Sequence, residues 1–147
     1  MSRNSLFLDS SALFAGIVSA DGAARVLLLL AEAGQVNLLV SERVIAEIER
    51  VIARKAPAVL NEVRQTILLA KVKILPDPEA VEVSEHLDWM SDPADVPILL
   101  AAMQGEVDFL MTLNRRHFID DAQVAQHSGF RIGPPGDALA WVREKLR

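Results

Sequence analysis

Residues 91–118, SDPADVPILLAAMQGEVDFLMTLNRRHF, decide the fold that we predict for this chain. An Asp-Pro-Ala-Asp start is followed by apolar residues at helical spacing, and Gly105 ends this helix. The apolar run at residues 109–112 is then a buried strand. A helix that leads into a short buried strand is typical of an α/β domain with a parallel sheet.

The same alternation of short apolar runs with longer segments of helical period extends over the rest of the chain. We predict strands at residues 6–8, 36–40, 72–75, 109–112 and 130–132. We predict a helix after residue 11, helices at residues 23–33, 42–55 and 59–70, a polar helix that ends at residue 90, a helix at residues 92–104, and a terminal helix through residue 141. This order predicts an α/β fold with a mostly parallel sheet of about five strands.

Length and composition indicate one domain over residues 1–147 and exclude several classes of protein. The chain is 51% apolar and 24% charged, and it contains no cysteine. The lack of cysteine excludes thiolate catalysis, Cys-ligated metal centres and a disulfide scaffold. The longest apolar run is too short to span a bilayer and the N-terminal residues lack a signal-peptide core, so we expect a cytoplasmic protein without a membrane span.

The net charge of -5 argues against a broadly basic surface that coats nucleic acid. It does not exclude a nuclease, because a nuclease can concentrate its acidic residues in one metal site. The positions of the acidic residues therefore carry more information than their number.

Acidic residues stand where a strand ends and where a helix begins. Asp9 directly follows the first strand, and ligands of open α/β sheets bind at the carboxyl ends of the strands. A half-buried carboxylate there would repel neighbouring acids unless a cation were present. Asp9 could equally be the N-cap of the next helix. Asp92 and Asp95 have the same two interpretations, because they also form a good helix start.

Glu47 lies at one edge of the apolar stripe of the helix at residues 42–55, and Arg43, Arg50 and Arg54 lie on its other side. Glu47 is then either part of a surface ion pair or a carboxylate that faces a metal ion. In the second case the arginines would take the phosphates of a substrate backbone. Oxygen ligands without a cluster of Cys or His suit Mg²⁺ or Mn²⁺, which perform phosphoryl chemistry.

Four motifs in this order resemble the PIN-domain ribonucleases, and among them the VapC-type toxins and related toxin nucleases. The motifs are LFLDSSALFAG from residue 6, SERVIAEIERV from residue 41, the stretch at residues 91–118, and PPGDAL from residue 134. The third motif is the most specific, since a D-x-x-I-x-x-A helix start precedes a strand that ends in T-x-N. The resemblance implies a three-layer α/β/α sandwich and a Mg²⁺- or Mn²⁺-dependent endoribonuclease that leaves a 5′-phosphate and a 3′-hydroxyl.

Residue by residue, the resemblance implies that the metal-binding acids are Asp9, Glu47 and Asp95, with Asp92 as a further candidate. Asn114 stands at a fourth catalytic position where many members of the family have Asp, so a second metal ion is in doubt. Residues Ser10, Ser11 and Thr112 would hydrogen-bond the carboxylates or their bound waters.

Candidates to bind substrate phosphate are Arg43, Arg50, Arg115, Arg116 and His117, although the last three also suit a solvated basic turn. Asp120 and Asp121 either compensate for Asn114 or are turn residues. The resemblance also implies a small antitoxin as partner and a homodimer. Leu27 to Leu30 and Trp141 are apolar residues that could lie at such surfaces, although core packing explains them more simply.

Two other functions compete with the nuclease. A haloacid-dehalogenase-like phosphatase needs a second acid two residues after the first, and position 11 is Ser. A PIN-like module that binds RNA or protein without cutting remains an alternative. In that case Asn114, in place of Asp, would mark the loss of catalytic activity.

Overall fold

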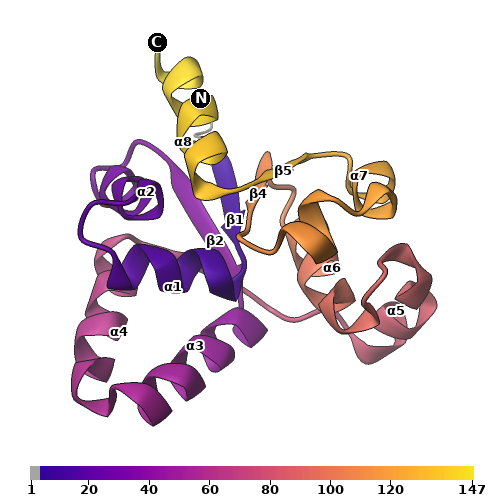
Figure 1. Ribbon diagram of the computed structural model, residues 1–147, viewed down its shortest axis with the longest axis horizontal. Helices are drawn as coiled ribbons and strands as arrows, with labels where there is room; N and C mark the ends of the chain where they lie inside the picture. Colours follow the sequence, from indigo (N-terminus) through magenta and orange to yellow (C-terminus); the bar gives the residue numbers. More distant parts are fainter. Residues whose placement is uncertain (1–3) are drawn as a thin grey trace.

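The computed structural model describes residues 4–147 and contains a five-stranded sheet in the order β3-β2-β1-β4-β5 (Figure 1). The strands are β1 (Ser5–Leu8), β2 (Asn37–Ser41), β3 (Lys73–Leu75), β4 (Phe109–Met111) and β5 (Arg131–Gly133). All four neighbouring pairs are parallel. The predicted α/β class is confirmed, with every pair of strands parallel.

The sheet lies between two groups of helices, with α1, α2 and α8 on one side and α5, α6 and α7 on the other (Figure 1). The helices are α1 (Ser10–Val18), α2 (Ala23–Glu32), α3 (Glu42–Lys55), α4 (Leu60–Leu69), α5 (Ala80–Glu85), α6 (Val96–Gln104), α7 (Ala122–Ser128) and α8 (Pro135–Leu146). Single helical turns are η1 (Pro57–Val59), η2 (Leu87–Trp89), η3 (Pro93–Asp95) and the π-helical η4 (Arg115–Ile119).

Strands β1 and β4 are apolar at every buried position because helices cover both faces of the sheet, and Ser41 at the end of β2 is the buried polar residue of the neighbouring strand. In β1, Leu6, Phe7 and Leu8 are completely buried, and β4 is buried throughout. Continuous apolar runs are what a parallel sheet covered on both faces requires. Of the apolar surface candidates, Leu29 is exposed, whereas Leu27 and Leu28 are buried in the core.

The strand order locates the ligand-binding edge of the sheet. From β1 the chain winds to β2 and β3 on one side, and it then returns to place β4 and β5 on the other side. The winding reverses between β1 and β4, and the carboxyl ends of two strands at such a reversal form a crevice that binds ligands. Asp9 follows β1 and Thr112 follows β4 at this point.

The segment after β4 and the start of α6 differ from the prediction. The α-helix begins at Val96 and not at Asp92, because Pro97 has no N–H and is tolerated in a first turn only. The preceding residues form the 3₁₀ turn η3, capped by Asp92. Two helical segments that the sequence pattern does not predict, η4 and α7, fill the connection between β4 and β5.

No single helix of residues 4–147 is long and apolar enough to cross a membrane. Helices α1 and α2 reach that length and composition only together, as a pair bent by 85°.

Candidate metal centre

A cavity of about 650 Å³ opens at the carboxyl ends of β1 and β4. Four separate segments of the chain line it: the start of α1, one face of α3, η3 with the start of α6, and the residues after β4. The lining residues include Asp9, Ser10, Ser11, Arg43, Glu47, Arg50, Asp95, Asn114 and Phe118. The structure therefore brings most of the predicted site residues to one place.

Asp9 is both the N-cap of α1 and a carboxylate that lines the cavity. The helix cap and the site residue are therefore not alternatives for this position. It is only 6% exposed. Its Oδ1 accepts hydrogen bonds from the Ala12 N–H at 3.0 Å and from the Ser11 hydroxyl at 2.7 Å. Its Oδ2 accepts a hydrogen bond from the hydroxyl of Thr112. Three donors therefore fix the orientation of this carboxylate.

Burial raises the pKa of Asp9 above its ordinary value, and the nearby Asp95 adds to the increase. The hydrogen bonds from Thr112, Ala12 and Ser11 act in the opposite direction, because they stabilise the charged carboxylate. The increase shows that the negative charge of Asp9 is held at a cost in free energy. A cation in the cavity would remove much of this cost.

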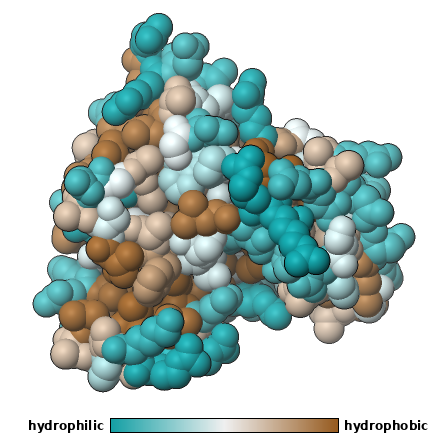
Figure 2. Space-filling model, viewed as in Figure 1, coloured by the Kyte–Doolittle hydropathy of each residue, from teal (hydrophilic) through white to brown (hydrophobic). Residues whose placement is uncertain are grey.

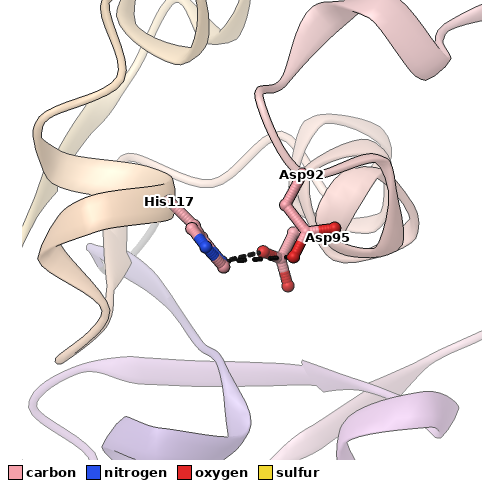
Figure 3. A group of neighbouring side chains, drawn as sticks. All are labelled: Asp92, Asp95 and His117. Carbon is pink, nitrogen blue, oxygen red and sulfur yellow. Dashed lines mark hydrogen bonds and ion pairs between the residues drawn. The ribbon is translucent and has the colours of Figure 1, made fainter.

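Asp95 lines the cavity, and Asp92 and His117 lie beside it, with the imidazole of His117 turned towards the two carboxylates (Figure 3). His117 Nδ1 lies 2.8 Å from Asp95 Oδ2 and 3.4 Å from Asp92 Oδ2. Burial raises the pKa of Asp95, the His117 hydrogen bond lowers it, and the charges of Asp92 and Glu47 raise it. His117 thus contacts the acidic residues and does not point to solvent as a phosphate-binding side chain of a basic turn would.

Glu47 projects from α3 into the cavity beside Arg43 and Arg50. The ion pairs found within residues 4–147 do not include Glu47, so the surface ion pair considered from the sequence does not form. Its charge acts on the pKa of Asp95, which places the two carboxylates near one another. The third predicted arginine, Arg54, is exposed outside the cavity lining.

Thr112 and Asn114, in the segment that follows β4, hold the surrounding backbone and side chains in place through hydrogen bonds. Thr112 is fully buried, and its Oγ1 also accepts the Asn114 N–H at 2.9 Å. The Asn114 side chain caps η4, because its Oδ1 accepts the His117 N–H at 3.1 Å. Ser11 ties α1 to the same loop by accepting the Leu113 N–H at 3.0 Å.

The remaining candidates lie away from the cavity. Arg115 and Arg116 are exposed and do not line it. Asp121 does not compensate for Asn114 and is not a solvated turn residue. Its carboxylate caps α7 through the Gln123 N–H and accepts two hydrogen bonds from Ser91, at 2.8 and 2.9 Å.

The residues of the cavity fit a divalent cation. Asp9, Glu47 and Asp95 offer carboxylate oxygens from three different elements. Burial is the main cause of the raised pKa values of Asp9 and Asp95, and the charge of a neighbouring carboxylate adds to each, from Asp95 on Asp9 and from Asp92 and Glu47 on Asp95. Asp92, Asp95 and His117 have ligand atoms within 4.8 Å of one another. Oxygen donors with little imidazole suit Mg²⁺ or Mn²⁺.

Comparisons with known proteins agree with this arrangement. The model of the PIN domain family matches residues 5–116. No curated protein matches the chain by sequence. Three crystal structures have a similar fold. PAE2754 from Pyrobaculum aerophilum is 17% identical, with a TM-score of 0.66 over 96% of this chain and 90% of that chain.

The other two contain VapBC2 from Rickettsia felis bound to a DNA fragment from their promoter, and FitAcB from Neisseria gonorrhoeae. VapBC2 is 17% identical, with a TM-score of 0.61 over 88% of this chain and 98% of that chain. FitAcB is 16% identical, with a TM-score of 0.56 over 88% of this chain and 97% of that chain. At such identities the likeness concerns the fold alone. The family match covers most of the chain and includes every acidic residue of the cavity, and the chain therefore belongs to the PIN domain family.

Proposed function

We propose that this protein is a divalent-metal-dependent endoribonuclease and the toxin of a toxin–antitoxin pair. The observation that carries the proposal is the convergence of Asp9, Glu47 and Asp95 from three elements on one cavity, at the point where the winding of the sheet reverses. The capping of α1 accounts for a buried Asp9, but it does not account for two further carboxylates in the same cavity.

The residues of the cavity divide into those that hold a cation and those that hold a phosphate. A bound Mg²⁺ or Mn²⁺ would supply a water of lowered pKa and positive charge for the phosphate in the transition state. Asp9, Glu47 and Asp95 would hold the ion, and the three hydrogen bonds to Asp9 favour its charged form and fix its orientation. Arg43 and Arg50 on the rim offer guanidiniums to the backbone of an RNA strand.

The test of the nuclease is Mn²⁺- or Mg²⁺-dependent cleavage of single-stranded and structured RNA by the full chain. Asp9→Asn keeps an oxygen for the N-cap but removes the charge, and we expect no cleavage. Asp121→Asn is the matched control, because Asp121 is also a buried N-cap but lies outside the cavity. Equal cleavage by the two variants would overturn the proposal.

An RNA-binding assay tests whether the arginines of the cavity contribute more to binding than other basic residues of α3. We expect the double variant Arg43→Ala/Arg50→Ala to bind RNA with a shallower slope of log affinity against log salt concentration. The decrease in the slope should correspond to the loss of about two phosphate contacts. Arg54→Ala/Lys55→Ala removes the same charge from exposed positions of the same helix and should leave the slope unchanged. Binding is measured in EDTA, so that cleavage does not interfere. An equal reduction in both variants would mean that only the overall charge matters.

The proposed antitoxin has an apolar groove available next to the cavity. The groove has a volume of about 390 Å³ and is lined by apolar side chains of α1, α3, η1 and α4, among them Phe14, Ile17, Val18, Val59 and Val63, together with the charged residues Arg25, Lys55 and Glu62. Figure 2 shows hydrophobic residues gathered in this region. Since α1 and α3 line both the groove and the cavity, one partner segment could cover both.

Co-expression with the product of an adjacent small open reading frame tests the partner. Val18 is 59% exposed in the groove and Leu68 is 71% exposed outside it. We expect Val18→Lys to lose the partner in co-purification and Leu68→Lys to retain it. The opposite result would remove this groove as the docking site. The homodimer stays a prediction, which sedimentation of the purified chain would test.

A catalytically weakened module is the second candidate, and the observation in its favour is Asn114. The Oδ1 of Asn114 is used to cap η4 and its side chain brings no charge to the cavity. RNA binding that depends on Arg43 and Arg50, without metal-dependent cleavage of any RNA, would support this alternative.

A further inference from the structure

We propose that His117 is a metal ligand, and that it forms with Asp92 and Asp95 a second cation position which selects imidazole-binding transition-metal ions such as Zn²⁺ over Mg²⁺. Asp95 would be shared with the ion of the Asp9, Glu47 and Asp95 cavity. The inference depends on the proposed function only because Asp95 would belong to both cation positions.

The distances in this cluster match those within one coordination sphere. Two ligand atoms bound at about 2.1 Å to the same ion lie about 3.0 Å apart at a right angle and about 3.4 Å apart at a tetrahedral angle. His117 Nδ1 lies 2.8 Å from Asp95 Oδ2 and 3.4 Å from Asp92 Oδ2. The three side chains converge from η4 and from the segment at η3, as Figure 3 shows. An ion could therefore replace the hydrogen bond with little movement of the side chains.

The backbone around His117 is held so that the imidazole faces Asp92 and Asp95. The His117 N–H donates to Asn114 Oδ1 at 3.1 Å, and the next residue, Phe118, is 2% exposed in the core. The N–H of Asn114 is in turn held by Thr112 Oγ1 at 2.9 Å. Asn114 is thus a positioning residue that acts through the backbone of His117. The side chain that contacts Asp92 and Asp95 from this loop is that of His117, three residues after Asn114.

The chemistry of the donors determines which ions this position selects. Mg²⁺ is a hard cation that prefers oxygen ligands, whereas imidazole is a common ligand of Zn²⁺ and of other first-row ions. Two carboxylates and one neutral imidazole leave room for a water, as in sites with three protein ligands. The Asp9 side of the cavity offers oxygen only and has no such preference.

The experiment follows the three imidazoles of the intact, EDTA-treated chain by ¹H–¹³C NMR during titration with Zn²⁺ or Mg²⁺. The chain has three histidines. His86 and His127 both pack on Trp89, with ring centroids 4.3 and 4.5 Å apart. Ring currents should separate their signals from that of His117, and they serve as internal controls. Among the three imidazole signals we expect Zn²⁺ to move that of His117 alone, and Mg²⁺, which would reach His117 only through the shared Asp95, to move it much less than Zn²⁺ does.

Calorimetry gives the affinities. We expect His117→Gln to weaken Zn²⁺ binding at least about tenfold and to change Mg²⁺ binding less than about twofold. His127→Gln is the matched control and should change neither. Asp92→Asn is a second variant that keeps an oxygen for the η3 cap at the Ala94 N–H, and it should weaken Zn²⁺ as well.

The possible outcomes separate this inference from the proposed function. If divalent ions bind and RNA is cut, but the His117 signal does not respond, the second cation position is wrong and the nuclease stands. If His117 responds to Zn²⁺ but no RNA is cut, the metal position stands and the nuclease is wrong. Equal movement of all three histidine signals would show unspecific binding and overturn the inference, and the absence of any divalent-ion binding would overturn both.

Discussion

The hydroxyl of Thr112 holds the buried charge of Asp9, and its removal should destabilise the fold in a pH-dependent manner. Thr112 is fully buried and donates to Asp9 Oδ2. Thr112→Val keeps the shape of the side chain but removes this hydrogen bond and the acceptor for the Asn114 N–H. A hydrogen bond to a charged group contributes about 1.5–3 kcal/mol. With an unfolding entropy of about 2.1 cal/mol/K per residue, this corresponds to a decrease in Tm of about 5–10 °C.

The sign of the pH dependence follows from the pKa of Asp9. Burial raises this pKa in the folded chain, and the Thr112 hydrogen bond is the largest effect that opposes the increase. Thr112→Val should therefore raise the folded-state pKa further. An acid with a raised folded-state pKa binds more protons in the native state, so stability falls as the pH rises above the ordinary Asp pKa of 3.8 and through the folded-state pKa. The difference in stability between variant and wild type should therefore widen as the pH rises through the folded-state pKa of Asp9.

The assay is thermal unfolding followed by circular dichroism in EDTA, at several pH values. Thr112→Ser is the matched control, because it keeps the hydroxyl and loses only a methyl group, at a cost of about 1 kcal/mol that does not depend on pH. A loss in Thr112→Val that is the same at both ends of the pH range, or equal to the loss in Thr112→Ser, would refute the account of Thr112 as the support of the Asp9 charge.

Three further predictions concern charge, packing and capping. Asp9→Asn should raise the Tm of the metal-free protein, because a buried charge is removed, and should abolish the increase in Tm that Mn²⁺ gives to the wild type; a lower Tm without metal would contradict this. A Cβ on Gly16 would lie 2.8 Å from Leu28 Cδ1, so Gly16→Ala should cost about 1–3 kcal/mol in urea unfolding, whereas Gly136→Ala meets nothing within 4 Å and should be neutral or stabilising. Asp121→Ala should destabilise the fold by about 0.5–2 kcal/mol through loss of the α7 cap, with calorimetric Mn²⁺ affinity unchanged; weaker Mn²⁺ binding would place this residue in the metal centre after all.

The parts of the chain that the sequence predicted well are those with local signals. The apolar run before Asp9 and the stretch at residues 91–118 predicted strands and a helix that the structure contains, because buried parallel strands and capped helices leave their pattern in neighbouring residues. The connection at residues 115–128 was missed. Its tie from Asp121 to Ser91 joins residues that are 30 positions apart, which only folding brings together.

His117 shows most clearly why the site could not be read completely from the sequence. In TLNRRHF it follows two arginines, and a basic turn that binds phosphate was a reasonable interpretation. The π-helical turn η4 rotates the imidazole towards Asp92 and Asp95, while Arg115 and Arg116 remain exposed. The signal that could have indicated this is the Asn three residues before His117, which is the spacing of a side-chain cap.

The residue types and their order along the chain already specified an α/β sheet and the acidic residues Asp9, Glu47 and Asp95, because hydrophobic periodicity and strand or helix ends are local properties of the chain. Whether these carboxylates meet was decided by the strand order β3-β2-β1-β4-β5, which puts the end of β4 beside the end of β1 although more than one hundred residues separate Asp9 from Thr112. Such a pairing arises from the packing of helices on both faces of the sheet, and no window of sequence contains it.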